Sequence, residues 1–248
     1  MDARPGWIPM VVVVGMGIAS GCRTANPVAP AMIPNRWLGP ARIAVAPALN
    51  LSGSTDFDSA GVADLMASEL SYADGISVVP VSRVLGELGR DGADRVRSPE
   101  QALALCDRLG ADAILVFAVT AYDAFDPPRV GISAQLHGRQ PLRRSGRIDP
   151  VSLSRRATLP DAAAEETTRG LLAETERVFD ASHAFVVEDV RHYAAIRSAD
   201  DSPYGWRRYV VSQRDYLRYC CYATIRSLLY GQHEDVLRER HGERVGMP

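Results

Sequence analysis

The apolar residues in the first half of the chain recur with the period of β-strands, and they predict a sheet. Residues 42–49 have the alternating pattern of a strand, and a second strand is predicted over residues 76–81, after a short Asp-Gly turn. Residues 113–122 form an unbroken apolar run, as expected of a central strand covered on both faces. Residues 130–137 alternate strictly, so we expect a half-exposed strand that pairs antiparallel with its predecessor.

Helices are predicted between these strands. Apolar residues with helical spacing indicate one helix over residues 59–73 and a short one over residues 82–88. The clearest local signal is Ser98-Pro-Glu-Gln101, a capping box with proline at the first helical position, and this third helix ends at Gly110. The order strand, helix, strand, helix, helix, strand, strand predicts a small mixed sheet flanked by helices, in the α/β class.

The last third of the sequence predicts a helical extension. Between residues 162 and 197 two apolar series step by seven, which places each on one face of a helix. The pattern fits one long helix or two helices broken near residues 180–182. A last helix is predicted from Ser212, its cap, to Leu229. The two series are Leu171, Val178, Phe185 and Leu172, Phe179, Val186, Tyr193.

An apolar leader precedes the predicted domain. Residues 7–18 are too few to cross a bilayer as a helix, which needs about 20 residues, and they have the length of a signal peptide core. They are followed by Ala19, Ser20, Gly21 and Cys22, a series that resembles the bacterial lipoprotein signal. The resemblance implies that the Cys22 thiol carries the lipid and that the cut falls before it. The alternative is an ordinary signal peptide cut nearby, since Ala19 stands where that signal usually has leucine.

The composition shifts divide the chain into six predicted parts. Residues 22–40 are rich in proline, which favours an extended linker that can span up to about 55 Å at about 3.1 Å per residue. The parts are a signal peptide (1–21), a lipidated linker (22–40), an α/β envelope domain (41–137), an arginine-rich irregular segment (138–160), a helical extension packing on the domain (161–231) and a charged tail (232–248).

Charge and cysteine content exclude several classes of partner. With a net charge of −2 and 23% charged residues, the chain has no electrostatic attraction for nucleic acid. All 28 basic residues are arginine, which we attribute to a GC-rich genome. If Cys22 is acylated, an odd number of cysteines remains, Cys106, Cys220 and Cys221, which argues against a disulfide framework. The pair at 220–221 lacks zinc-ligand spacing and is predicted to be buried.

We find no set of residues that indicates catalysis, a metal or a cofactor. None of the histidines lies in a metal-spaced cluster or near a glycine-flanked serine. A phosphate-binding loop of the Walker type needs a lysine, and this sequence has none. The histidines are His137, His183, His192, His233 and His241. The sequence therefore predicts a protein that is not an enzyme.

Aromatic residues and arginine gather near the last helix. Trp206, Arg207, Arg208 and Tyr209 are consecutive, and these residue types are enriched where proteins bind one another. They form a candidate partner surface. The competing interpretation is that they pack the final helix onto the sheet.

One part of the chain resembles a known group of envelope proteins. Residues 43–53 (IAVAPALNLSG), 63–70 (ADLMASEL), 78–83 (VVPVSR) and 109–116 (LGADAILV) carry the resemblance. The group includes the curli-secretion channel lipoprotein, the lipoprotein activator of penicillin-binding proteins and the amino-terminal domain of the Tol periplasmic protein. The resemblance covers residues 42–136. It implies an α/β domain used for docking or assembly, with no catalytic residues to carry over.

Taken together, these patterns predict a lipid-anchored bacterial envelope protein that serves as a non-enzymatic binding or assembly module. Its expected partners are the membrane, through lipid on Cys22, and an envelope protein. The sequence is also compatible with an oligomer. Arg23 is not the aspartate that retains lipoproteins in the inner membrane of enterobacteria, which favours the outer membrane facing the periplasm. The alternatives are a subunit of an oligomeric outer-membrane secretion channel and an envelope hydrolase. The channel needs a pair of alternating segments of about 9 to 11 residues, whereas residues 130–137 alternate strictly but the segment next to them is rich in arginine.

Overall fold

The computed structural model describes residues 31–35, 39–55, 57–138, 170–197 and 203–230. Cys22 and the rest of residues 1–30 lie outside these ranges, as do most of the predicted arginine-rich segment and the predicted tail.

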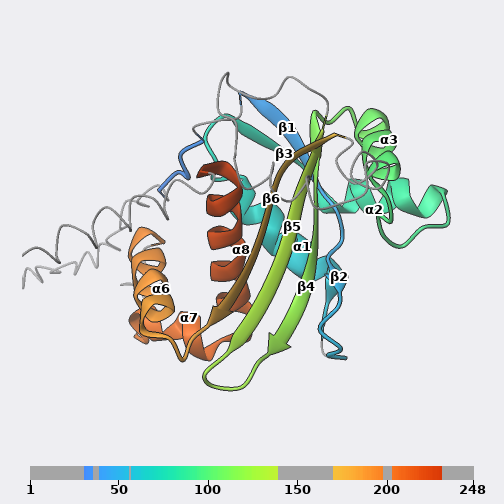
Figure 1. The fold of residues 1–248 in the computed structure, drawn as a ribbon. Coiled ribbons are helices and arrows are strands. Elements are labelled where there is room, and N and C mark those ends of the chain that lie inside the picture. Colours follow the sequence, from blue (N-terminus) through green and yellow to red (C-terminus); the bar gives the residue numbers. More distant parts are fainter. Residues whose placement is uncertain (1–30, 36–38, 56, 139–169, 198–202, 231–248) are drawn as a thin grey trace, which may run out of the picture.

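Six strands form one sheet in the order β3-β1-β4-β5-β6, with β2 beside β4 (Figure 1). The strands are β1 (Ala41–Val45), β2 (Leu49–Asn50), β3 (Ile76–Val79), β4 (Ala113–Asp123), β5 (Arg129–Gly138) and β6 (Leu171–Asp180).

The sheet is mixed, as the order of elements predicts. β1 runs parallel to both β3 and β4, while β4, β5 and β6 form an antiparallel series. The apolar run of β4 is central, and Ile114, Leu115 and Phe117 are almost fully buried. β5 is more buried than the half-exposed strand we expected, because it lies between β4 and β6.

Helices cover both faces of the sheet (Figure 1). α1 and α8 contribute to the core on one face, and α2 and α3 to a second core on the other. Asp58 and Ser98 cap α1 and α3 as N-caps, the latter accepting a hydrogen bond from the amide of Gln101. No helix among the described residues is long and apolar enough to cross a membrane. The helices are α1 (Ser59–Leu70), α2 (Val81–Arg90), α3 (Pro99–Leu109), α6 (Ala184–Ile196), the 3-10 turn η2 (Gly205–Arg207), α7 (Arg208–Val211) and α8 (Gln213–Tyr230).

The helix predicted across residues 162–197 is wrong in its first described part. Leu171–Asp180 is β6, a strand of the sheet, and only Ala184–Ile196 is helical. The expected break near residues 180–182 is present as a turn between the two. The spacing of seven was misleading because the apolar residues of β6 lie at its two ends and the residues between them, Glu174–Arg177, are all polar. Antiparallel pairing with β5, which satisfies the backbone of β6, makes this segment a strand. The helical extension therefore begins at α6, after the sheet is complete.

Candidate interaction surface

The four residues predicted as a partner surface do not all face solvent. Trp206 is half-buried and Arg207 is exposed, whereas Tyr209 is 6% exposed and packs edge-on against Tyr193 of α6, with ring centroids 5.1 Å apart. Arg208 is held by Asp215, with its Nε 2.8 Å from a carboxylate oxygen. Tyr209 therefore belongs to the core, whereas the three residues before it lie at the surface, and their binding of a partner stays a prediction.

A residue distant in the sequence completes the exposed part. The Arg191 guanidinium carbon of α6 lies 4.5 Å from the Trp206 ring centroid, and that of Arg207 lies 5.2 Å from it. Tyr204, next to this stack in the chain, is 74% exposed. We name the set Arg191, Tyr204, Trp206 and Arg207 the Trp206 surface. Its residue types are those that carry most binding energy in protein interfaces.

A buried carboxylate fixes the carboxyl-terminal half of α6. Glu69 of α1 is 1% exposed. It accepts hydrogen bonds from the Tyr193 hydroxyl at 2.9 Å and from Arg197 Nη2 at 2.7 Å, and Arg218 of α8 lies 3.9 Å away. Burial raises the pKa of Tyr193 far above its usual value, and the charge of Glu69 adds to this, so the hydroxyl remains a donor. Glu69 therefore joins α1, α6 and α8 through charge as well as packing.

A second carboxylate fixes the middle of α6. Asp189 accepts hydrogen bonds from the Tyr219 hydroxyl at 3.0 Å and from Arg226 Nη2 at 3.0 and 3.1 Å. Both donors lie on α8. Burial and the charge of Asp189 raise the pKa of Tyr219, so it too stays protonated. Because Arg191 lies two residues after Asp189, this contact sets the part of α6 that touches Trp206.

The turn between α7 and α8 is fixed by a third carboxylate. Asp215, in the first turn of α8, pairs with Arg208, and its amide donates to the Ser212 hydroxyl at 3.3 Å. Burial opposes ionisation of Asp215, but hydrogen bonds from Arg208 and Ser212 outweigh it and lower its pKa. Ser212 thus acts as the predicted cap. The Trp206 surface is therefore carried on elements held by three polar contacts.

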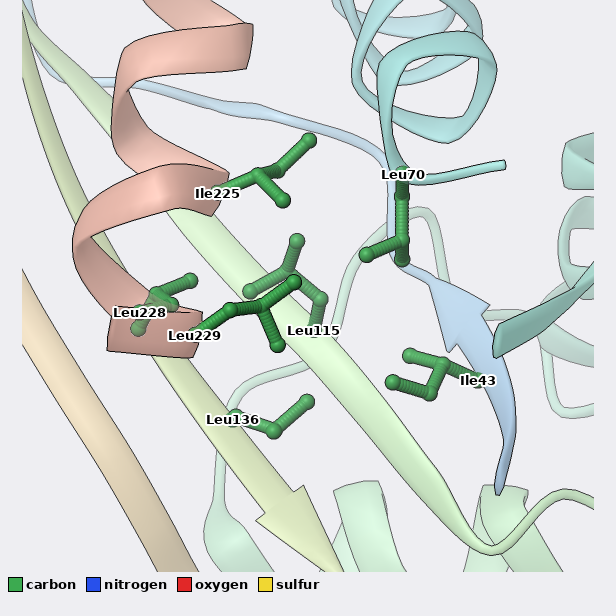
Figure 2. A pocket seen from close by; sticks show the side chains of 7 residues that line it. All are labelled: Ile43, Leu70, Leu115, Leu136, Ile225, Leu228 and Leu229. Carbon is green, nitrogen blue, oxygen red and sulfur yellow. The ribbon is translucent and has the colours of Figure 1, made fainter. Parts of the chain in front are cut away.

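A cavity between α1, α8 and the sheet offers no chemistry (Figure 2). Its volume is about 10 Å³, close to the least that a water molecule needs, and a water there has no polar side chain to bind. Figure 2 shows aliphatic side chains pointing into it from both helices and three strands. They are Ile43, Leu70, Leu115, Leu136, Ile225, Leu228 and Leu229.

The residues considered for chemistry remain apart. Among the described residues no three histidine, cysteine, aspartate or glutamate side chains are grouped to hold a metal ion. His137 is buried beside Gln135, while His183 and His192 are exposed. Cys106, Cys220 and Cys221 are buried and form no disulfide among the described residues, and burial is what we expected for the adjacent pair. His233, His241 and the lipid-attachment candidate Cys22 lie outside the described residues.

The sequence matches no protein-family model, and it matches no curated protein. Comparison with solved structures finds similarity to lipoprotein GNA1162 from Neisseria meningitidis, the LpoB C-terminal domain from Salmonella enterica and the PelC dodecamer from Paraburkholderia phytofirmans, among others. Identities are 20%, 9% and 13%, and TM-scores are 0.40, 0.39 and 0.29. The matches cover 66%, 58% and 63% of this chain and 99%, 84% and 82% of the respective structures. At these scores the likenesses assign this chain no class, activity or partner.

Proposed function

We propose that this protein is a lipid-anchored module of the bacterial cell envelope that binds a protein partner through the Trp206 surface and does no chemistry itself. The observation that carries the proposal is the Arg191–Trp206–Arg207 stack, which faces solvent on elements fixed by buried ion pairs. A rigid aromatic and arginine surface loses little conformational entropy on binding. The proposed anchor is lipid on Cys22, and the proposed place is the outer membrane, facing the periplasm.

The chemistry of the surface indicates the kind of partner. Arg207 and Arg191 are exposed, and Arg191 pairs with Glu188, which is itself exposed. A partner that presents acidic side chains beside an apolar or aromatic group would complement both the guanidinium charges and the indole. Such a contact fits a small, specific interface.

Crosslinking in intact membranes tests the surface. We expect the native chain to give a defined adduct with an envelope protein, and Trp206→Ala and Arg207→Ala to lower its yield about tenfold, as loss of an interface hot spot does. Phe125→Ala and Arg95→Ala are the matched controls, because both residues are exposed elsewhere. An adduct that survives Trp206→Ala, or is lost equally in Phe125→Ala, contradicts the proposed surface.

The anchor is tested separately with Cys22→Ser. We expect this variant to incorporate no labelled palmitate and to leave the membrane fraction, since the acyl chains supply about 0.8 kcal/mol per buried methylene. A Cys22→Ser protein that still sediments with membranes and keeps its crosslinked partner refutes lipid anchoring at this residue.

A further inference from the structure

The end of the predicted linker is not free but lies against the domain. Ile33 forms a parallel bridge with Ala73, which lies in the turn between α1 and β3. Its amide donates to the Tyr72 carbonyl at 2.7 Å, and its carbonyl accepts from the Asp74 amide at 2.9 Å. The Ile33 side chain is 2% exposed. This short segment therefore has the burial and backbone pairing of a strand, although it is the approach to the domain.

Arg197 ties the same segment to the buried carboxylate network. Its Nη1 donates to the Ala31 carbonyl at 3.0 Å, while its Nη2 donates to Glu69 at 2.7 Å. The guanidinium carbon also lies 4.0 Å from the centroid of the Tyr72 ring. The Arg197 side chain is 8% exposed. One guanidinium at the end of α6 thus joins the incoming chain, α1 and α6.

We infer that Ile33 and Arg197 form a tether clamp, which decides the side of the domain that faces the bilayer. The inference rests on the proposed lipid on Cys22. With the clamp closed, only the nine steps from Cys22 to Ala31 separate the lipid from the domain, which is at most about 32 Å of chain. Without it, the lipid could sit about 55 Å from the start of β1 on a longer, unoriented linker.

The clamp lies at one end of the sheet. β1, β3 and β4 are parallel and begin at the same end, and the clamped Ala73 lies three residues before β3. The hairpin between β4 and β5, which carries the exposed Phe125, is at the other end, about 36 Å away for an eleven-residue strand. Figure 1 shows residues 31–35 near the top and this hairpin at the bottom. The clamp therefore directs the strand starts toward the membrane and the hairpin away from it.

Hydrogen exchange on the soluble Cys22→Ser protein tests the clamp without lipid. We expect slow exchange at the amides of Ile33 and Asp74, and at least about tenfold faster exchange at both in Ile33→Ala and Arg197→Gln. Ile33→Ala leaves Glu69 paired, so it separates release of the tether from loss of the ion pair. Arg108→Gln, which breaks an ion pair with Asp91 on the other face, is the control. Fast exchange at Ile33 in the parent protein, or no change in both clamp variants, overturns the clamp.

Energy transfer on vesicles tests the orientation. The lipidated chain carries a donor dye at Ser71→Cys, an exposed position beside the clamp, or at Phe125→Cys, and the vesicles carry acceptor lipids. We expect transfer from position 71 to exceed that from position 125 by more than about twofold, given the strand length, and Ile33→Ala to remove the difference. Equal transfer from both positions in the parent overturns the inferred orientation. A chain that does not bind vesicles at all refutes the lipid anchor instead, while the exchange result still decides the clamp.

Discussion

At the scale of single residues, charge rather than apolar packing decides where α6 lies. The helix buries Val186, Val190 and Tyr193, but its register on α1 and α8 is set by Glu69 and Asp189. An apolar contact is non-directional and tolerates a shift along the helix, whereas a buried carboxylate must keep its donors. Because Glu69 and Asp189 fix the register of α6, they also fix the position of Arg191 against Trp206.

The Glu69 network predicts a large loss of stability from a small change. Glu69→Gln removes the charge that neutralises the buried Arg197, so we expect the free energy of unfolding to fall by about 3 kcal/mol. Glu188→Gln is the matched control, because Glu188 pairs with Arg191 at the surface, and there we expect a loss below about 0.5 kcal/mol. Urea unfolding followed by circular dichroism measures both. Equal losses in the two variants would show that the Glu69 charge is not required.

The lowered pKa of Asp215 predicts that the stability of the fold falls at acidic pH. Its pKa is lowered in the folded protein, so its contribution is fully present above the unfolded value of about 3.9 and is lost as the pH falls through the lower folded value. We expect Asp215→Asn to be less stable than the parent at neutral pH and the difference to shrink below about pH 4. Urea midpoints across this range measure it. Asp64→Asn, which removes an exposed carboxylate of α1 without touching Arg208, is the control, and a difference that grows on acidification would contradict the assignment.

At the scale of elements, the sequence predicted the features that depend on neighbouring residues in the chain, such as helix caps. Ser98 and Ser212 both cap helices in the structure, because a cap depends only on residues within one turn. β6 was missed because a strand depends on its partner. Its apolar residues are spaced by seven and do not alternate, and it is a strand because it pairs with β5.

The Ser98 cap predicts a measurable element-scale effect. Ser98→Ala leaves the Gln101 amide without its acceptor, and we expect the unfolding free energy to fall by about 1 kcal/mol. Ser82→Ala is the control, since Ser82 is exposed in the first turn of α2 and that helix has no side-chain cap. Thermal unfolding of the two variants and the parent measures the difference. A Ser98→Ala protein as stable as the Ser82→Ala protein would place the start of α3 under the control of tertiary packing.

At the scale of the whole molecule, the candidate surface was only half predictable. Trp206 and Arg207 could be named from composition, but nothing in the sequence joins them to Arg191, fifteen positions away from Trp206. Tyr209 could not be assigned to the core without knowing that α7 packs against α6, where its ring meets that of Tyr193. Contacts between residues far apart in the chain form only in the tertiary structure, so the local patterns of a single sequence do not predict them.

The fold buries three cysteine thiols in its two cores. Their reactivity therefore tests whether the two cores unfold together. Cys106 lies in the core beneath α2 and α3, while Cys220 and Cys221 lie in the core beneath α1 and α8. Burial raises the pKa of Cys220 and of Cys221 well above the usual value, with the neighbouring thiol adding to the effect at Cys220 and Glu69 adding to it at Cys221. Neither is therefore a thiolate near neutral pH.

We accordingly expect no alkylation of these three thiols in the folded Cys22→Ser protein, and their reaction in urea to follow global unfolding. Iodoacetamide labelling read by mass spectrometry, site by site, measures this. Ser71→Cys supplies an exposed thiol that must react at once under the same conditions. If Cys106 reacted at lower urea than the pair in α8, the two faces of the sheet would open separately. The two cores share β1 and β4, whose alternate residues face opposite sides, so loss of either helix layer should expose the sheet that supports the other, and a single transition is the expected result.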